Sequence, residues 1–392
     1  MPKGTNQVIK MELFKFVAPE IIFGRRALGQ VGESLARLGV KNVFIVTDPG
    51  VLAAGWVEKI TPVIKEAGLA YQIWSEVTSN PRDYEVHEGV EAFLNSGCNA
   101  VLGIGGGSPI DAAKSIALLS SNQGKISDYE GADKIQHPLP PLVAVPTTAG
   151  SGSEVTQFAI INNTDSKRKM VIGSKSLIPD ISLIDPITLT TKDKELTANT
   201  GCDVLAHAIE ALVSLAATPL TDVQALNAIK LVTEYLPLSI SNKTNLEAKG
   251  AMAMASLQAG LAISNAILGL VHAMSHPLGG LLDMPHGEAC AILLPYVMEY
   301  NLPAAIDRYG TIAEAMGQNV AGLSKRAAAE KAVEAVRRLA RDIGIPDKLS
   351  EVGLTGEYIR QLSEYALQDV CILTNPREAQ MEDIIKIYTD AL

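Results

Sequence analysis

Cysteine is scarce in this chain, and the four cysteines that it has stand far apart. Cys98, Cys202, Cys290 and Cys371 are spread over 392 residues without a Cys-x-x-Cys pair. Disulfide-rich secreted domains and thiolate zinc sites need closely spaced cysteines, so this spacing argues against both. We expect reduced thiols in a cytoplasmic protein, each packed as a small hydrophobic side chain.

Runs of basic residues and uninterrupted apolar segments are also missing from the sequence. The formal net charge is -10, whereas nucleic-acid binding needs a clustered basic surface, so we expect no nucleic-acid partner. The apolar stretch from Ala251 to Leu270 contains Ser, Gly, Gln and Asn, which is typical of a buried core helix. The polar residues from Met1 to Lys10 lack the apolar core of a secretory signal. We therefore expect no association with a membrane.

The composition is that of a globular protein with enough apolar sequence for two packed domains. Hydrophobic residues make up 47% of the chain. Before residue 190, short β-rich runs alternate with amphipathic segments, a pattern that predicts βαβ units and a mainly parallel sheet. The expected strands are Asn42 to Thr47, Tyr71 to Val77, Asn99 to Ile104, Leu142 to Val145, Gln157 to Asn162, Lys169 to Ile172 and Ile181 to Ile184. The fifth and sixth are expected to form an antiparallel hairpin added to this sheet.

Beyond about Thr191 the hydrophobic pattern is helical. The clearest expected helices are Asp203 to Ser214, Asp222 to Tyr235, Ala248 to Asn265 and Lys325 to Ile343. No internal repeat or flexible linker separates the two halves. We predict an α/β domain at residues 1–190 and an all-helical domain at residues 191–392, packed together with a cleft between them.

A glycine-rich loop follows the strand expected at Asn99 to Ile104. The run Gly105-Gly106-Gly107-Ser108 opens a helix that continues past Asp111. Glycines let backbone approach a ligand closely, and a helix N-terminus offers free N–H groups to phosphate. A tight strand-to-helix turn is the alternative interpretation. Because the Gly-Lys-Ser/Thr ending is missing, the loop is not the P-loop of an NTPase.

Two further loops follow predicted strands. The segment Pro146 to Glu154, which contains Thr147 and Thr148, is rich in glycine and hydroxyl groups, and Asp48 ends the first strong strand. Open α/β sheets bind ligands at the carboxyl ends of their strands. A carboxylate at Asp48 can accept hydrogen bonds from an adenosine ribose and would repel a 2′-phosphate, which favours NAD over NADP. A polar turn and a turn aspartate are the alternatives.

Histidine is rare, yet four of the six histidines lie between residues 207 and 286. Asp203 and His207 share one helical face at i, i+4 spacing and can bind one ion. His272 and His276 lie on a second helix, and His286 begins a third. A carboxylate with imidazoles suits a divalent ion such as Fe²⁺ or Zn²⁺.

Alternative roles for these histidines fit the sequence less well. A single histidine on an apolar helix is usually a packed core residue, but several unpaired imidazoles are costly to bury among small and apolar neighbours. The segment His272-Ala-Met-Ser-His276 lacks the glutamate of a metalloprotease helix. The Glu-x-x-His pairs of di-iron bundles are missing as well. A mononuclear metal site is therefore favoured.

Together these motifs resemble the iron-containing (group III) alcohol dehydrogenases. They are Gly105-Gly106-Gly107-Ser108-x-x-Asp111-x-x-Lys114, the loop Pro146 to Glu154, Gly201-x-Asp203-x-x-x-His207-Ala208-Ile209-Glu210, His272-Ala273-Met274-x-His276-Pro277-Leu278-Gly279, Pro285-His286-Gly287 and Thr374-Asn375-Pro376-Arg377. The resemblance implies a Rossmann-like dinucleotide-binding domain followed by a helical metal-binding domain, with a dehydroquinate synthase-like fold. It also implies NAD(P)-linked interconversion of alcohols with aldehydes or ketones, and a homodimer or larger homo-oligomer.

The resemblance also assigns roles to individual residues. The metal ligands fall on Asp203, His207, His272 and His286, and His276 is a pocket residue beside the metal. The implied cofactor contacts are Gly105, Gly106, Gly107 and Ser108 to the pyrophosphate, Asp48 to the adenosine ribose, Thr147 and Thr148 to the adenine side, and Asp111 and Lys169 to the ribose and nicotinamide. Leu212 stands where many relatives have tyrosine, and Phe158 stands where some have a polar residue near the cofactor. These two differences leave the substrate preference open.

The mechanism expected of such a site is metal-assisted hydride transfer. The ion, Fe²⁺ or Zn²⁺, stabilises an alkoxide, hydride passes to the nicotinamide of NAD, and His276 relays the proton. Relatives act on short alcohols, diols, lactaldehyde-like hydroxyaldehydes, 3-hydroxypropionaldehyde and acidic aldehydes such as succinic semialdehyde and sulfoacetaldehyde. The sequence shows no obvious cationic anion-binding residue, which favours small neutral substrates. Rival interpretations are a lyase of the dehydroquinate synthase type and a non-catalytic NAD or metal sensor.

Overall fold

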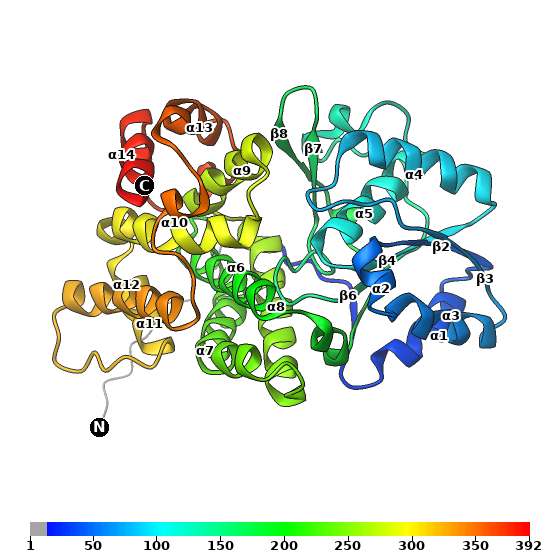
Figure 1. The fold of residues 1–392 in the computed structure, drawn as a ribbon, viewed down its shortest axis with the longest axis horizontal. Helices are drawn as coiled ribbons and strands as arrows, with labels where there is room; N and C mark the ends of the chain where they lie inside the picture. Colours follow the sequence, from blue (N-terminus) through cyan, green and yellow to red (C-terminus); the bar gives the residue numbers. More distant parts are fainter. Residues whose placement is uncertain (1–13) are drawn as a thin grey trace.

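The computed structural model describes residues 14–392, with the strands early in the chain and helices throughout the later part (Figure 1). The prediction about Met1 to Lys10 falls outside these residues. The expected fold class is confirmed, because a parallel sheet with helices precedes a helical domain. The boundary proposed at residue 190 lies in the short 3-10 helix η4 (Pro186–Thr191) and stays a prediction.

The main sheet has six parallel strands in the order β1-β9-β6-β4-β2-β3. Their bounds are β1 Glu20–Phe23, β2 Asn42–Val46, β3 Ala70–Trp74, β4 Ala100–Gly105, β6 Leu142–Pro146 and β9 Ile181–Ile184. The central strands β4 and β6 are buried along their whole length, since both faces of the sheet are covered. The remaining elements around the sheet are α1 Val31–Arg37, α2 Pro49–Ala53, α3 Trp56–Glu66, α4 Asp83–Ser96 and α5 Gly107–Ser121.

Two apolar layers hold these helices to the sheet. Val31 of α1 and Ile60 of α3 pack in one layer with Val43. Val86 of α4 and Ile116 of α5 pack in another layer with the opposite side of the strands. Fully burying a side chain of this kind contributes about 1.5–3 kcal/mol, so each layer fixes its helices firmly.

The predicted hairpin forms, but its place in the fold was wrongly predicted. Strands β7 (Phe158–Asn163) and β8 (Arg168–Gly173) are antiparallel, and β8 also pairs with the short strand β5 (Gly131–Ala132), so the three form a separate sheet. The hairpin does not extend the parallel sheet, whose edge strands are β1 and β3, because β7 packs on α5 and β8 packs on the helical domain. Strands β1 and β5 were not predicted, since runs of four and two residues carry little periodic signal.

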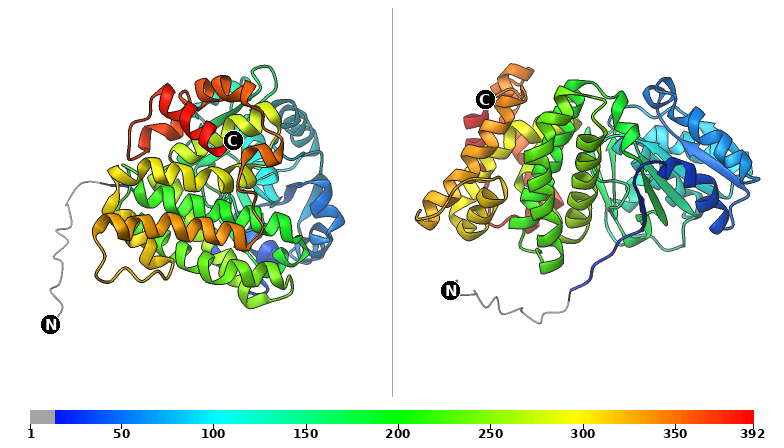
Figure 2. Two further views of the ribbon diagram at one scale, coloured as in Figure 1. Left: turned by 60° about the vertical axis from the view of Figure 1, so that its left-hand side comes forward. Right: turned by 90° about the horizontal axis from the view of Figure 1, so that it is seen from below.

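The helical domain contains α6 to α14 (Figure 2). Their bounds are α6 Lys194–Val213, α7 Pro219–Ser241, α8 Leu246–Ala266, α9 Leu270–Leu282, α10 His286–Asn301, α11 Ile306–Ala315, α12 Lys325–Asp342, α13 Ile359–Ala366 and α14 Met381–Ala391. Short 3-10 helices lie at Ala27–Gln30, Ile126–Tyr129, Lys175–Leu177, Pro186–Thr191, Leu302–Ala304, Leu349–Val352, Gly356–Tyr358 and Val370–Thr374, the last being η8.

Helix α6 begins nine residues before the predicted Asp203, because Asp193 caps its N-terminus by accepting from Leu196 N at 2.7 Å.

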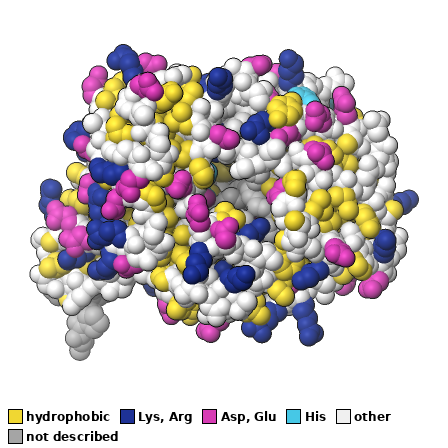
Figure 3. Space-filling view, in the orientation of Figure 1, with side chains coloured by type: hydrophobic (Ala, Val, Ile, Leu, Met, Phe, Trp, Pro, Cys, Tyr) yellow, Lys and Arg dark blue, Asp and Glu magenta, His cyan; other side chains and the backbone are white. Residues whose placement is uncertain are grey.

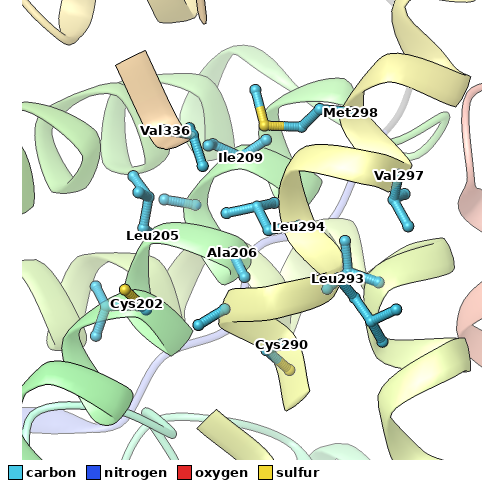
Figure 4. Close-up of a cluster of buried hydrophobic side chains, with 14 of the residues drawn as sticks. Cys202, Leu205, Ala206, Ile209, Cys290, Leu293, Leu294, Val297, Met298 and Val336 are labelled. Carbon is cyan, nitrogen blue, oxygen red and sulfur yellow. The ribbon is translucent and has the colours of Figure 1, made fainter. Parts of the chain in front are cut away.

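Helices α6 and α10 pack closely through small and apolar side chains. Figure 4 shows Ala206 and Ile209 of α6 facing Leu294 of α10 in one buried cluster. Small residues such as Ala206 let the two helices approach, and the apolar contacts fix their relative rotation. This packing determines where the polar residues on the same helices lie.

The sheet domain and the helical domain also meet at close range. A Cβ on Gly152, in the loop after β6, would lie 2.6 Å from the Cα of Gly260 on α8. Nearby, a small hollow is lined by residues of that loop, η4, α6, α7 and α8, among them Thr148, Leu189 and Thr200. The face seen in Figure 3 carries basic and acidic side chains interspersed with one another.

Among residues 14–392, no single helix is long and apolar enough to cross a bilayer. Only the pair α8 and α9, bent by 103° at their junction, meets the length and composition criteria when taken together.

Candidate metal centre and ligand-binding loops

The structure brings the four predicted metal ligands together. Asp203 Oδ1 lies 3.7 Å from His207 Nε2, 3.6 Å from His272 Nε2 and 3.8 Å from His286 Nε2. Asp203, His207 and His272 are buried, whereas 26% of the His286 side chain is exposed. Although three imidazole nitrogens surround it, Asp203 Oδ1 has no hydrogen-bond partner. A buried carboxylate oxygen without a donor is unfavourable, so this atom points to a missing ligand.

These distances fit a single divalent ion. Nitrogen and oxygen donors bound at 2.0–2.2 Å in tetrahedral geometry lie roughly 3.3–3.6 Å from one another. The three spacings to Asp203 are only a few tenths of an ångström longer. The donor atoms that all lie within 4.8 Å of one another belong to Asp203, His272, His286 and Cys290, so His207 joins the site by its distance to Asp203 alone. A carboxylate with imidazoles has the chemistry to hold Fe²⁺ or Zn²⁺.

At Asp203, His207 and His286 the directions of the pKa shifts agree with metal binding, whereas the pKa of His272 is raised, so that imidazole must lose a proton when a cation binds. Burial alone would raise the pKa of Asp203, but the neighbouring imidazoles of His207 and His286 lower it below its usual range. Burial lowers the pKa of His207 to about 4 and that of His286 well below its ordinary value. An anionic carboxylate with neutral imidazoles is the form that binds a cation.

Glu210, which the sequence motif contained without an assigned role, orients His272. Its Oε2 lies 2.5 Å from His272 Nδ1, so Nδ1 donates and Nε2 is left to face Asp203. Its Oε1 accepts from Val271 N at 2.6 Å in the first turn of α9. Burial opposes charge on His272, but Cys290 and Glu210 raise the pKa of His272 well above its usual value. Carboxylates that hold ligand histidines in this way are a common feature of metal sites.

The C-terminal motif Thr374 to Arg377 proves to be structural. Asn375 Oδ1 accepts from Leu270 N at 3.1 Å, and the Asn375 amide pairs with Asn301 of α10. These bonds fix the start of α9 relative to α10. The motif therefore positions the two helices that carry His272 and His286.

His276 lies beside the ligand set and is held by a residue that the sequence did not reveal. Its Nδ1 is 2.7 Å from Asp369 Oδ2, and its ring stacks on His286 with a centroid distance of 5.5 Å. Burial alone would raise the pKa of Asp369, but the neighbouring His276 lowers it, and the net effect is a pKa below the usual value. Asp369 is 93 residues from His276 in the chain, and no spacing rule connects them.

Lys169 reaches the same region from the sheet domain. A Cβ on Gly279 of α9 would lie 2.8 Å from Lys169 Cε, and one on Gly280 would lie 3.0 Å from Lys167 O. Two consecutive glycines thus let the β7–β8 hairpin lie directly against α9. Burial lowers the pKa of Lys169, while Cys290, Asp203 and Asp111 raise it.

The predicted cofactor loops converge at one edge of the sheet. Strands β2, β4 and β6 are neighbours and parallel, so Asp48, the glycine loop and Thr148 follow their carboxyl ends. A Cβ on Gly106 would lie 3.3 Å from Thr148 Oγ1, and one on Gly107 would lie 3.0 Å from Ser151 Oγ. The N-terminus of α5, which includes Ser108, has no side-chain cap, so its N–H groups are available to an anion.

The individual residues of these loops differ in their surroundings. Asp48 Oδ1 accepts from Val51 N at 2.8 Å and caps α2, as the turn interpretation expected. Thr148 lines the hollow between the domains, whereas Thr147 is fully buried. Burial raises the pKa of Asp111 to about 6, and Asp111 Oδ2 accepts from Ile160 N at 3.1 Å.

Lys114, the last residue of the glycine motif, has a structural role. It is fully buried, and its Nζ donates to Thr156 O at 2.8 Å and to Phe158 O at 2.7 Å. Asp111 and Lys114 therefore tie strand β7 to helix α5. This connection holds the hairpin that carries Lys169.

Comparison with known proteins identifies the family. Residues 18–186 match the family described as "Iron-containing alcohol dehydrogenase", and residues 197–392 match "Fe-containing alcohol dehydrogenase family, C-terminal". The chain belongs to the iron-containing alcohol dehydrogenases. The resemblance inferred from the motifs is confirmed.

Individual relatives align over almost the whole chain. The NAD-dependent methanol dehydrogenase of Bacillus methanolicus is 42% identical over 377 residues, covering 96% of this chain and 99% of that protein. The 1,3-propanediol dehydrogenase of Klebsiella pneumoniae is 43% identical over 382 residues, covering 97% and 99%. A crystal structure of 1,3-propanediol oxidoreductase is similar with a TM-score of 0.95 at 42% identity, covering 97% of this chain and all of that one. The chain is an iron-type, NAD-linked alcohol and aldehyde oxidoreductase, and the lyase and sensor interpretations are not favoured.

Proposed function

We propose that this dehydrogenase interconverts small uncharged primary alcohols and their aldehydes with NAD(H), using Fe²⁺ held by Asp203, His207, His272 and His286. The observation that carries the assignment is the buried Asp203 Oδ1, which has three imidazole nitrogens within 3.8 Å and no hydrogen-bond partner. Relatives named for methanol and 1,3-propanediol support small neutral substrates.

The protein residues divide the remaining work. When bound, the ion supplies Lewis acidity that polarises the substrate oxygen and stabilises negative charge on it. The Gly105 to Ser108 loop and the uncapped start of α5 bind the pyrophosphate of NAD, and Asp48 accepts from the adenosine ribose. Thr147 and Thr148 lie on the adenine side. Asp111 and Lys169 position the ribose and the nicotinamide.

His276 exchanges the proton of the substrate hydroxyl with solvent. Asp369 accepts from His276 Nδ1, so Nε2 carries the exchangeable site. Because Asp369 holds the ring, the tautomer and the orientation of His276 are fixed. The pair His276 and Asp369 lies next to His286, and neither residue belongs to the four-residue ligand set.

Three further properties belong to the same proposal. Asp48 disfavours a 2′-phosphate, so NAD is preferred over NADP. Zn²⁺ fits the same donors as Fe²⁺. We also propose that the enzyme acts in the cytoplasm as a homodimer or larger homo-oligomer.

The substrate proposal is tested by a steady-state screen. Chelator-treated protein reconstituted anaerobically with Fe²⁺ is assayed with NADH or NADPH against propanal, 3-hydroxypropionaldehyde, lactaldehyde, succinic semialdehyde and sulfoacetaldehyde. We expect the neutral aldehydes and NADH to give the highest kcat/KM. A preference for the acidic aldehydes would refute the substrate class, and the absence of net NADH oxidation would refute the reaction.

The role of His276 is tested by His276→Ala, with the exposed His137→Ala as a control. We expect turnover to fall about 100-fold, the low end for loss of a general acid or base, with bound iron near stoichiometric. The pH dependence of kcat should also flatten. Loss of iron from the variant would instead make His276 a metal ligand.

A further inference from the structure

Cys290 lies among the donor atoms of the metal centre. It stands one turn after His286 on α10, and its Sγ is 3.7 Å from His286 Nε2 and 3.8 Å from His272 Nε2. Donor atoms of Asp203, His272, His286 and Cys290 all lie within 4.8 Å of one another. Three residues of the proposed ligand set therefore share their space with a thiol.

The spacing is compatible with sulfur coordination, and Sγ also lies 3.9 Å from His286 Nδ1. A zinc-bound thiolate at about 2.3 Å and an imidazole nitrogen at 2.0–2.1 Å lie roughly 3.6 Å apart in tetrahedral geometry. Both Sγ to Nε2 distances are within a few tenths of an ångström of that value. The unpartnered Asp203 Oδ1 independently marks the same space as a cation site.

Cys202 provides a contrast within the same helix pair. It is also buried and directly precedes Asp203, but it is not part of the donor cluster. Figure 4 shows the two cysteines on different helices of the α6–α10 contact. Burial of a thiol near the centre does not by itself place sulfur among the imidazoles.

We propose that Cys290 is an alternative, sulfur donor of the metal centre, which completes a four-donor set with Asp203, His272 and His286 in place of His207, and that it raises the affinity for Zn²⁺ relative to Fe²⁺. Thiolate is a softer ligand than carboxylate or imidazole, and it favours Zn²⁺ over harder ions. On binding, the Cys290 thiol loses its proton to solvent and the sulfur lone pair forms the bond to the ion. This inference rests on the proposed Asp203 and histidine ligand set.

The first test is spectroscopic and independent of turnover. Chelator-treated full-length protein is loaded with Co²⁺ under anaerobic conditions, and its near-ultraviolet absorption is recorded. We expect a sulfur-to-cobalt charge-transfer band in the wild type and in Cys202→Ser, and its loss in Cys290→Ser and Cys290→Ala. A wild-type spectrum without the band, or a band that persists in both Cys290 variants, would overturn the proposal.

A competition experiment measures the consequence. With Zn²⁺ and Fe²⁺ offered together, we expect the ratio of bound zinc to bound iron to fall about tenfold in Cys290→Ala, comparable to the effects of changing residues that support a metal site. Two variants are used so that a folding defect in one does not decide the result. An unchanged ratio contradicts the inference about Cys290 alone, whereas failure of the wild type to bind any of these ions contradicts the proposed ligand set as well.

Discussion

The metal centre is formed by polar side chains, whereas the glycine loop is formed by backbone groups. The centre uses long polar side chains from α6, α9 and α10, with Glu210 holding one of them from behind. The glycine loop uses backbone N–H groups and residues without side chains, at the carboxyl end of strand β4. The metal centre depends on the chemical identity of each side chain, whereas the glycine loop depends on the absence of side-chain atoms.

This difference predicts how substitutions act. A change in the charge or donor type at the centre should alter the bound ion without changing the space around it. An added methyl group in the loop should alter the space without changing any charge. Three experiments separate these effects, in order of decreasing size.

The largest effect is expected for Asp203→Asn. The amide keeps the shape but removes the negative charge that three imidazole nitrogens face. We expect bound iron to fall below about a tenth of stoichiometric and kcat/KM to fall on the order of 1000-fold, equivalent to about 4 kcal/mol. Metal analysis and steady-state kinetics measure both quantities.

The control for that variant is Asp307→Asn, since the Asp307 side chain is 73% exposed and pairs only with an exposed lysine. It should retain metal and activity. Full metal content in Asp203→Asn would show that the cluster does not depend on charge and would remove the contrast between the two regions.

A smaller effect is expected for Gly107→Ala in the glycine loop. The new Cβ would lie 3.0 Å from Ser151 Oγ, so the loop or its neighbour must shift. We expect the Kd for NAD to rise about tenfold, or 1.4 kcal/mol, with unchanged iron content. Gly29→Ala is the matched control because no atom lies within 4 Å of its added Cβ. Equal NAD affinity in both variants would contradict the proposed contact.

The smallest effect concerns stability and the buried Glu154 at the end of the loop after β6. Burial raises the pKa of Glu154 to about 7, from 4.5 for an unperturbed glutamate. Since the folded-state pKa is the higher one, its contribution to stability is fully present below pH 4.5 and is lost as the pH rises through 7. Wild-type protein should therefore lose stability relative to Glu154→Gln between about pH 5 and pH 8.

We expect the Tm difference between wild type and Glu154→Gln to change by a few degrees over this pH range. The effect is small because the nearby Lys114 offsets part of the free-energy cost of burying the charged Glu154 carboxylate. Thermal unfolding across this pH range measures it. The exposed Glu91→Gln should follow the wild type at every pH. A constant Tm difference between wild type and Glu154→Gln would show that the carboxyl is not destabilised by burial.

Much of the fold was predictable because its signals are local. The strands β2, β4, β6 and β9 are largely apolar runs. Helix α9 carries His272 and His276 as expected, and α10 begins at His286, where the third helix was expected to start. The hairpin was predicted from two β-rich runs that flank the polar turn at residues 162–168, but its placement depends on packing against α5 and α9. The start of α6 was missed because its cap, Asp193, lies outside the apolar pattern.

The sequence by itself determined the types of donor, namely one carboxylate and a set of histidines, and the glycines that precede a helix. These depend on residue identity and on spacings of a few positions, which secondary structure converts directly into proximity. Only the tertiary structure decided that Glu210 holds His272, that Asp369 holds His276 and that Cys290 stands among the imidazoles. Each depends on how helices rotate and cross in the core, and many buried side chains far apart in the sequence set that arrangement together.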